Sequence, residues 1–183
     1  MHDRPQLNAD AMQFRVPAPT RRSMVRGWRR AALAVALCCA AAPALAQTVV
    51  SYTGPAVPIP DNQPSGANAY VQVAGLGQIT DVDFRIDALP GCDATPGNPA
   101  AGITHTFVGD LVITLFSPAG TSLTVVNRRG GTRENICNLL LDDDGGFPSL
   151  ATITSTTGQT VAGSFASDAP LLAFDGQNPN GIW

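Results

Sequence analysis

The chain has 183 residues, with eleven Arg and no Lys against fourteen Asp and Glu, and a formal net charge of −3. Seven of the Arg precede residue 47, so residues 47–183 carry four Arg against twelve acidic residues, a formal net charge of −8. An acidic surface without Lys argues against binding to nucleic acid or to an anionic membrane surface.

The first 46 residues have the parts of a secretory signal peptide. A basic segment, "RRSMVRGWRR", precedes the apolar run "AALAVALCCAAA", and "ALA" before Gln47 is a small-x-small cleavage site. We therefore expect cleavage after Ala46 and an exported chain, 47–183, about one domain long. The apolar run is too short to predict a stable transmembrane helix. Translation is expected to start at Met24, because residues 1–23 add polar sequence that a signal peptide does not need.

The pattern after residue 47 is that of β-strands. In residues 79–87, Val82, Phe84 and Ile86 alternate with charged residues, which predicts a strand with one buried and one wet face. Residues 110–116 are apolar on both faces, as in a strand covered on both sides. Further short β-type runs are residues 122–127, 150–156 and 159–165, separated by clusters rich in Gly, Pro and Asp. No segment keeps a helical period, so we expect an all-β sandwich, most similar to a jelly roll.

Two cysteines remain after the predicted cleavage, Cys92 and Cys137. An even pair in an exported protein favours a disulfide, and two buried thiols are the alternative. Cys92 lies in a long loop, residues 90–102, which the disulfide would hold in place. Two cysteines and one histidine do not make a four-ligand zinc site.

His105 and Asp110 lie close enough in sequence to raise the question of catalysis. A structural role is the preferred interpretation: Asp110, at a turn before a strand, would be a buried carboxylate bonded to backbone N–H groups, and His105 would cap the strand. Metal binding and an interface stay open for this pair. No serine lies in a helix-opening Gly-Thr-Ser motif or a G-x-S-x-G elbow, and no glycine-rich phosphate loop is present. The chain is therefore not expected to contain a protease.

Three consecutive carboxylates, Asp142, Asp143 and Asp144, form an acidic turn. Calcium, which takes six to eight oxygen ligands, is one remedy for their repulsion, and a solvated acidic turn is the alternative that the sequence favours. Asp61 is a weaker calcium candidate. The positive charges in residues 128–133 are expected to decorate a hairpin loop rather than neutralise this turn.

Four motifs occur in a fixed order: "IPD" (59–61), "ITHTFVGDLVITLFSPAGT" (103–121), "FDG" (174–176) and "NGIW" (180–183). In this order they resemble the P domain, or P/Homo B domain, of subtilisin-like proprotein convertases. The residues that carry the resemblance are His105, Gly109, Asp110, Ser117, Pro118, Gly120, Thr121, Phe174, Gly176, Gly181 and Trp183.

The resemblance implies a jelly-roll sandwich of about eight strands. It implies that residues 47–56 are a short lead and that residues 57–183 are a P domain lacking its last strand or strands, because Trp183 would begin a closing strand and fill the core with its ring. In convertases such a domain follows the catalytic domain and stabilises it, and in secreted bacterial proteins it also occurs without an adjacent protease.

The first functional hypothesis is an exported, non-catalytic module that stabilises or targets a partner, a subtilisin-like serine endopeptidase domain on a longer or separate chain. The alternative is a stand-alone jelly-roll module that binds carbohydrate or peptide. It ranks lower because it needs exposed aromatic side chains, and those after residue 47 are few and mostly lie in core-like patterns. They are Tyr52, Tyr70, Phe84, Phe107, Phe116, Phe147, Phe165, Phe174 and Trp183.

Overall fold

The computed structural model describes residues 6–7, 11–15, 47–60 and 63–183; Met24, the cleavage position after Ala46 and Asp61 lie outside these residues. The described residues form strands and short 3-10 helices, and no α-helix. In this part of the chain no helix is long and apolar enough to cross a membrane. The strands are β1 (Gln6–Leu7), β2 (Ala11–Arg15), β3 (Gln47–Ser51), β4 (Val57–Pro58), β5 (Gln72–Val73), β6 (Asp81–Ile86), β7 (Val112–Phe116), β8 (Ser122–Asn127), β9 (Ile136–Leu141), β10 (Val161–Phe165) and β11 (Gly181–Ile182), and the 3-10 helices are η1 (Val108–Asp110), η2 (Leu150–Thr152) and η3 (Leu171–Phe174).

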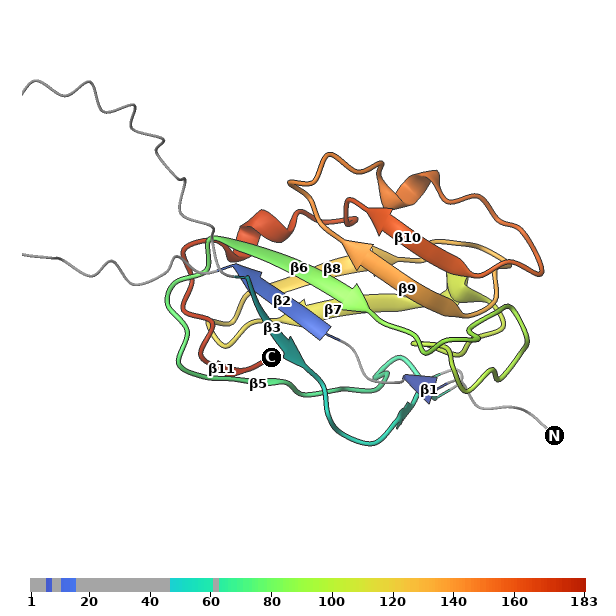
Figure 1. The fold of residues 1–183 in the computed structure, drawn as a ribbon, viewed down its shortest axis with the longest axis horizontal. Helices are drawn as coiled ribbons and strands as arrows, with labels where there is room; N and C mark the ends of the chain where they lie inside the picture. Colours follow the sequence, from blue (N-terminus) through green and yellow to red (C-terminus); the bar gives the residue numbers. More distant parts are fainter. Residues whose placement is uncertain (1–5, 8–10, 16–46, 61–62) are drawn as a thin grey trace, which may run out of the picture.

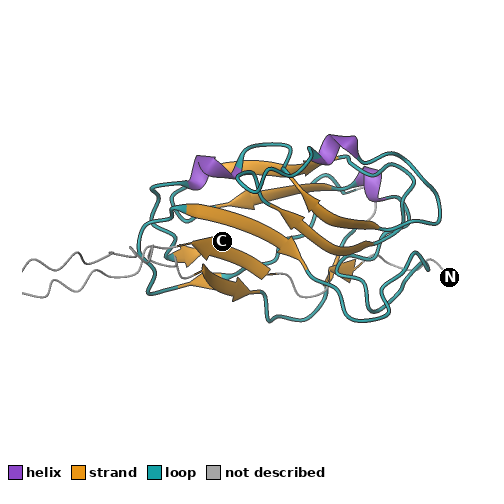
Figure 2. Cartoon of the chain, turned by 45° about the horizontal axis from the view of Figure 1, so that its top comes forward, coloured by secondary structure: helices purple, strands orange, loops and turns teal. Residues whose placement is uncertain are grey.

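Two layers of strands enclose the core (Figure 1). The larger layer is a five-stranded sheet in the order β10-β9-β6-β2-β3, and the β7–β8 hairpin lies behind it. The short pair β5–β11 extends the structure at one end, and the 3-10 helices lie at the periphery (Figure 2). Leu139 and Leu141 of the larger sheet and Leu115 and Val125 of the hairpin are buried in one core. The predicted all-β sandwich is confirmed.

Strand β6 has the alternation that the sequence predicts on its core face. Val82 and Ile86 are fully buried and Phe84 is 7% exposed. The opposite face is predicted to be wet, and for Asp83 this prediction is wrong, because Asp83 is 3% exposed. Gln47 Nε2, at the start of β3, donates to Asp83 Oδ2 at 2.7 Å. A buried carboxylate is thereby supplied with a hydrogen-bond donor from another strand.

Strand β7 is less buried than the sequence predicts. Val112 is 50% exposed and Phe116 is 57% exposed, whereas Leu115 is 6% exposed. Strand β7 pairs with β8 in antiparallel register, with Ile113 opposite Val126. The prediction of a strand covered on both sides is therefore wrong, because the larger sheet covers one face of the hairpin and the other face meets solvent.

Residues 150–156 do not form the predicted strand. The first three are η2, whose N-cap Ser149 accepts a hydrogen bond from Ala151 N through its Oγ at 3.2 Å, and the rest is loop. A local cap offers the backbone a partner that competes with a strand ladder, which explains the difference.

Strand β9 is not among the predicted strands, although it is central to the larger sheet. It runs antiparallel to β6 and parallel to β10. Its apolar run is interrupted by the exposed Asn138, which has a φ of 49° and accepts a hydrogen bond from Ala88 N through Oδ1 at 2.9 Å. The interruption breaks the period-2 pattern by which a strand is detected in a sequence.

Cys92 and Cys137 form the predicted disulfide. It joins the loop after β6 to the second residue of β9, with the two Cα atoms 5.9 Å apart and 45 residues of sequence separation. The alternative of two separate thiols is therefore wrong. Within the same loop, the Asp93 carboxylate accepts hydrogen bonds from Asn98 Nδ2 and Thr95 N, which lower its pKa.

Replacing both bridged cysteines, as Cys92→Ser with Cys137→Ser, is expected to lower the free energy of unfolding by up to about 4 kcal/mol, because a cross-link of this span restricts the unfolded chain. Urea titration of the oxidised proteins measures the difference. Dithiothreitol should destabilise the wild type and leave the double variant unchanged, and an equal response of both would contradict the prediction.

Candidate functional site

The backbone and ring of His105 are tied to the framework of the sandwich. Its N donates to Asn135 Oδ1 at 3.1 Å, and its O accepts from Asn135 N at 2.8 Å. Its Nδ1 accepts from Phe107 N at 3.0 Å, which turns the chain into η1. The half-buried imidazole thus holds a local turn.

Asp110 ends η1 and is exposed, so the expectation of a buried carboxylate there is wrong. Asp110 belongs to η1, whereas the backbone of His105 is bonded to Asn135. The bonds of His105 support the structural interpretation of this residue.

Gly109 lies where two backbones meet. Gly109 N donates to Gly131 O at 2.9 Å, and a Cβ on Gly109 would lie 2.7 Å from Gly131 Cα. Any side chain at this position would push the turn at 128–133 away from η1. The Gly of the "VGD" motif therefore allows two chain segments to approach each other closely.

The "SPAGT" motif, residues 117–121, is a turn joined to the C-terminal segment. Gly120 N donates to Ser117 O at 2.9 Å, and Ala119 does not have a positive φ, so the Ser-Pro-Ala-Gly turn is type I. Ser117 Oγ donates to Gln177 Oε1 at 2.9 Å, and Gln177 Nε2 donates to Thr121 Oγ1 at 2.9 Å. One glutamine thus bonds to both ends of the turn, a role that the sequence did not reveal.

The "FDG" and "GIW" motifs complete the same end of the core. Phe174 is fully buried and meets the ring of Trp183 edge to face, with ring centroids 5.0 Å apart. Trp183 Nε1 donates to Pro179 O at 2.8 Å, so the buried indole N–H has an acceptor. The predicted core position of the Trp183 ring is correct.

The backbone conformation at Gly176 and Gly181 explains why both motifs contain glycine. Gly176 N donates to Ile79 O at 2.8 Å with a φ of 76°. Gly181 has a φ of 141°, and a Cβ there would lie 2.7 Å from Pro118 Cβ. Both positions favour Gly for its freedom of φ, and at Gly181 also because there is no room for a side chain.

Asn135 is a buried polar centre that the sequence did not indicate. Its side chain is fully buried and its φ is 61°. Nδ2 donates to Asp93 O and Thr95 O, both at 2.8 Å, and the backbone O accepts from Val161 N at 3.0 Å. With its two bonds to His105, Asn135 joins the disulfide loop, the His105 segment and β10.

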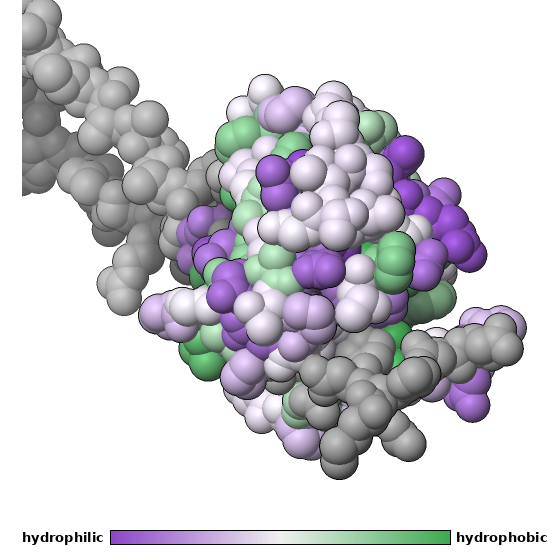
Figure 3. Space-filling view, turned by 90° about the vertical axis from the view of Figure 1, so that its right-hand side faces the viewer, coloured by the Kyte–Doolittle hydropathy of each residue, from purple (hydrophilic) through white to green (hydrophobic). Residues whose placement is uncertain are grey.

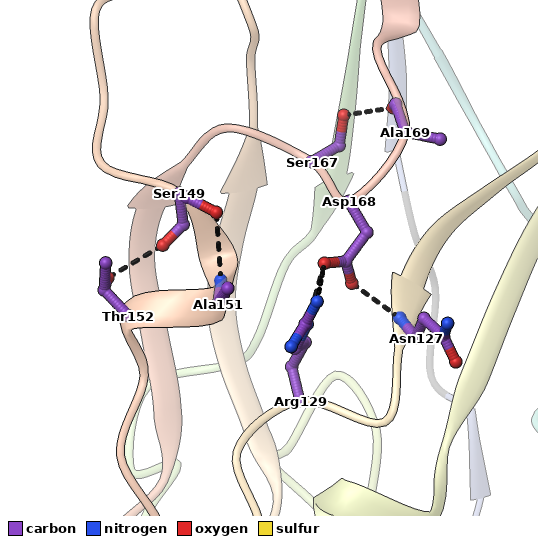
Figure 4. A network of polar contacts seen from close by, with 8 residues as sticks. All are labelled: Asn127, Arg129, Ser149, Ala151, Thr152, Ser167, Asp168 and Ala169. Atoms are coloured by element: carbon purple, nitrogen blue, oxygen red, sulfur yellow. Dashed lines mark hydrogen bonds and ion pairs between the residues drawn. The ribbon is translucent and has the colours of Figure 1, made fainter.

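A second polar network holds the end of β8 (Figure 4). Asp168 Oδ2 accepts from Asn127 N at 2.7 Å, and Asp168 Oδ1 accepts from Arg129 Nε at 2.7 Å. The hydrogen bond that Arg129 donates to Asp168 raises the pKa of Arg129. Arg133 donates instead to Thr154 O and Thr160 O. These arginines hold loops and do not neutralise the acidic turn.

The acidic turn is stabilised by its own backbone. Asp142, 6% exposed, accepts from Asp144 N at 3.0 Å and from Gly145 N at 2.8 Å through Oδ1. Asp143 Oδ2 accepts from Leu172 N at 3.1 Å. Partial burial raises the pKa of Asp175, and the negative charges of Asp143 and Asp144 add to this effect.

Where the structure describes the chain, no group of three His, Cys, Asp or Glu residues is placed to hold a metal ion. Calcium at this turn stays a prediction, and Asp61 lies outside the described residues.

One family model matches residues 100–183 of the chain, the range that holds the motif residues from His105 to Trp183. That family is the proprotein convertase P-domain. The predicted resemblance is confirmed over these residues, whereas the P-domain boundary expected at residue 57 stays a prediction. No curated protein matches the chain, and no solved structure matches it.

Asn135→Ala is expected to destabilise the sandwich strongly. It removes one acceptor for His105 N and the donor for the part-buried carbonyl groups of Asp93 and Thr95, and each polar group left without a partner costs up to about 1–3 kcal/mol. Thermal and urea unfolding measure the loss.

Asn138→Ala is the matched control, because Asn138 also has a positive φ but is exposed and accepts one hydrogen bond through its side chain. The Asn135 variant should lose at least about 2 kcal/mol more than the control, since one group is affected in the control and three in the buried network. Equal losses would mean that backbone conformation, and not the buried network, sets the cost.

If the acidic turn binds calcium, adding calcium should raise the melting temperature, by the equivalent of about 2.7 kcal/mol at one hundred times the Kd. Asp142→Asn should abolish the rise, since Asn keeps an oxygen for the two N–H groups of the turn but removes the charge. The exposed Asp110→Asn serves as the control. A wild-type melting temperature that is the same in calcium and in chelator would leave a solvated turn.

Proposed function

We propose that this chain is an exported, non-catalytic P-domain module that stabilises or targets a subtilisin-like serine endopeptidase domain on a longer or separate chain. The P-domain family is associated with the catalytic domains of subtilisin-like convertases. The role in proteolysis is thus one of support, and the acidic surface of residues 47–183 is directed at a protein partner rather than at nucleic acid.

This proposal rests on one observation: the motif residues make contacts that hold the fold together. Ser117 and Thr121 are bonded to Gln177, and Phe174 packs on Trp183. Residues with hydroxyl and imidazole groups that could serve chemistry are engaged in turns, which supports a scaffold without a reaction of its own.

The alternative, a stand-alone module that binds carbohydrate or peptide, gains support from exposed aromatic side chains. Tyr70 is 66% exposed, Phe107 51%, Phe116 57% and Phe147 37%. The expectation that most of the nine aromatic residues lie in core-like patterns does not extend to these four. On the face in Figure 3, however, hydrophobic residues are separated by polar and near-neutral ones and do not form a continuous platform.

The proposal predicts that the purified chain extends the thermal half-life of a subtilisin-like catalytic domain from the same genome and hydrolyses no peptide by itself. His105→Ala should leave the absence of peptidase activity unchanged, because its Nδ1 accepts a backbone N–H in a turn. The assay is residual protease activity after heating, with and without the chain.

Phe116→Ser and Tyr70→Ser test whether the exposed aromatic side chains contribute to the contact with the protease domain. No change in protease half-life, together with saturable binding to a glycan or peptide array that these variants abolish, would favour the alternative. Peptidase activity that disappears with His105→Ala would contradict the proposal outright.

A further inference from the structure

The turn that follows β8 holds three residues in the left-handed region of backbone conformation. They are Arg128, Gly130 and Gly131, with φ values of 54°, 91° and 56°. Glycine enters this region without a steric cost, whereas the Cβ of any other L residue crowds the backbone there. Two of the three positions therefore have the residue that the backbone favours, and Arg128 is the exception.

The strain at Arg128 has no counterpart in the contacts of its side chain. In the described part of the chain, the other residues with a positive φ that are not glycine are Asn135 and Asn138. Asparagine tolerates this conformation better than most residues, and both side chains are bonded within the sandwich. The exposed Arg128 side chain has no bond among the described residues, whereas the other three arginines after residue 47 all have one. A strained residue whose side chain the fold does not use indicates a functional contact.

Arg128 lies at one end of an uncharged hairpin. Its N donates to Leu111 O at 2.9 Å, and the residue before it, Asn127, is the register partner of Val112 at the start of β7. Residues 111–127, which include β7 and β8, contain no Asp, Glu, Lys, Arg or His. The positive charge of Arg128 therefore lies at the border of a neutral surface.

The outer face of the hairpin, turned away from the larger sheet, carries exposed apolar side chains (Figure 1). Val112, Thr114 and Phe116 alternate along β7 with residues that pack in the core, so they share this face. Val112 is 50% exposed and Phe116 is 57% exposed, and the Thr114 hydroxyl between them is bonded to a hydroxyl of β8. These three residues form a strip roughly 13 Å long.

We propose that this strip, together with Arg128, is the surface by which the chain docks on the catalytic domain of its protease partner. The inference rests on the proposed function for the identity of the partner, and it adds the place and the chemistry of the contact. The partner presents an apolar surface to Val112 and Phe116 and a carboxylate to Arg128. Arginine and aromatic side chains are the residues that most often dominate the energy of such contacts.

Charge favours this partner over a second copy of the chain. Residues 47–183 carry a formal net charge of −8, so two copies repel each other. A carboxylate on the partner is attracted locally by Arg128, and no charge of residues 111–127 opposes burial of the apolar strip beside it. A catalytic domain of neutral or positive net charge with one acidic group at the contact meets both conditions.

The test measures binding of the purified full chain to a subtilisin-like catalytic domain from the same genome, inactivated at its nucleophilic serine, by biolayer interferometry. Arg128→Gly relieves the strain and removes the charge. It should keep the melting temperature or raise it by up to about 4 °C, and weaken binding at least about tenfold. Arg128→Gln, which keeps the strain, should weaken binding as much and lose most of the salt dependence of the wild type.

Arg85→Gln is the matched control for the loss of one positive charge, because Arg85 lies on β6 and pairs with Asp87. Its affinity should equal that of the wild type. Val112→Ser should weaken binding about threefold, because half of a valine side chain loses its apolar contact. Its control is Val49→Ser on β3, which should not change the affinity, since Val49 is 52% exposed but belongs to the larger sheet.

The docking surface is refuted if the wild type binds but the Arg128 variants bind as tightly as Arg85→Gln, or Val112→Ser as tightly as Val49→Ser. The proposed function would then stand, with the contact elsewhere. A melting temperature of Arg128→Gly below that of the wild type would mean that the arginine serves the fold, and would also overturn the proposal.

Absence of binding by the wild type would overturn the proposed function and this inference with it. Self-association of the wild type in light scattering that Val112→Ser abolishes would assign the face to a second copy instead.

Discussion

The buried side chain of Asn135 is the constraint on which much of the sandwich depends. A polar group without solvent contact has to find partners within the protein, and Asn135 finds them in three separate segments: the disulfide loop, the turn at His105 and, through its backbone, β10. Its positive φ then directs the chain into β9, the strand that pairs with both β6 and β10. The disulfide acts on the same loop through the second residue of β9. A covalent bond and a buried amide thus hold one junction between the loop and the sheet.

The residues that identify the P-domain match belong mainly to a framework of this kind. Gly109 permits a contact between two backbones, and Ser117 closes a turn whose other end bonds to Gln177. Trp183 closes the core against Phe174. A fold can host many functions, so residues that build the fold identify the architecture and leave the surface to determine the partner. On the described surface of this chain, the exposed aromatic residues and the acidic groups are the features that remain for that purpose.

Alternation in the sequence predicted strand β6 and its core face, and β8 was predicted as a short β-type run between turn-forming clusters. Alternation fails where other forces act. Strand β9 was missed because Asn138 interrupts its apolar run, and residues 150–156 were misassigned because Ser149 caps a 3-10 turn. The motif residues were interpreted as structural, and the contacts of Gly109, Ser117 and Trp183 agree with that interpretation, whereas the buried carboxylate expected at Asp110 was wrong. Asn135, Gln177 and Asp168 were not foreseen, since their partners lie 30 or more residues away and no local pattern marks such contacts. The disulfide was predictable because cysteine usage in an exported chain carries its own signal.

The two sides of the larger sheet are held in different ways. Around β9 and β10, the disulfide, the Asn135 network and the Arg133 bonds to Thr154 O and Thr160 O link several loops to each other. At β3, the link to the sheet is a main-chain ladder to β2 and one hydrogen bond from Gln47 to Asp83. Proteins open locally where few interactions cross-connect, and the free energy of such opening is smaller than that of global unfolding. Local opening at β3 can therefore take place while the framework of motif residues remains intact. The part of the sheet around β9 and β10 and the part at β3 therefore differ in how firmly they are held, because different segments hold each of them.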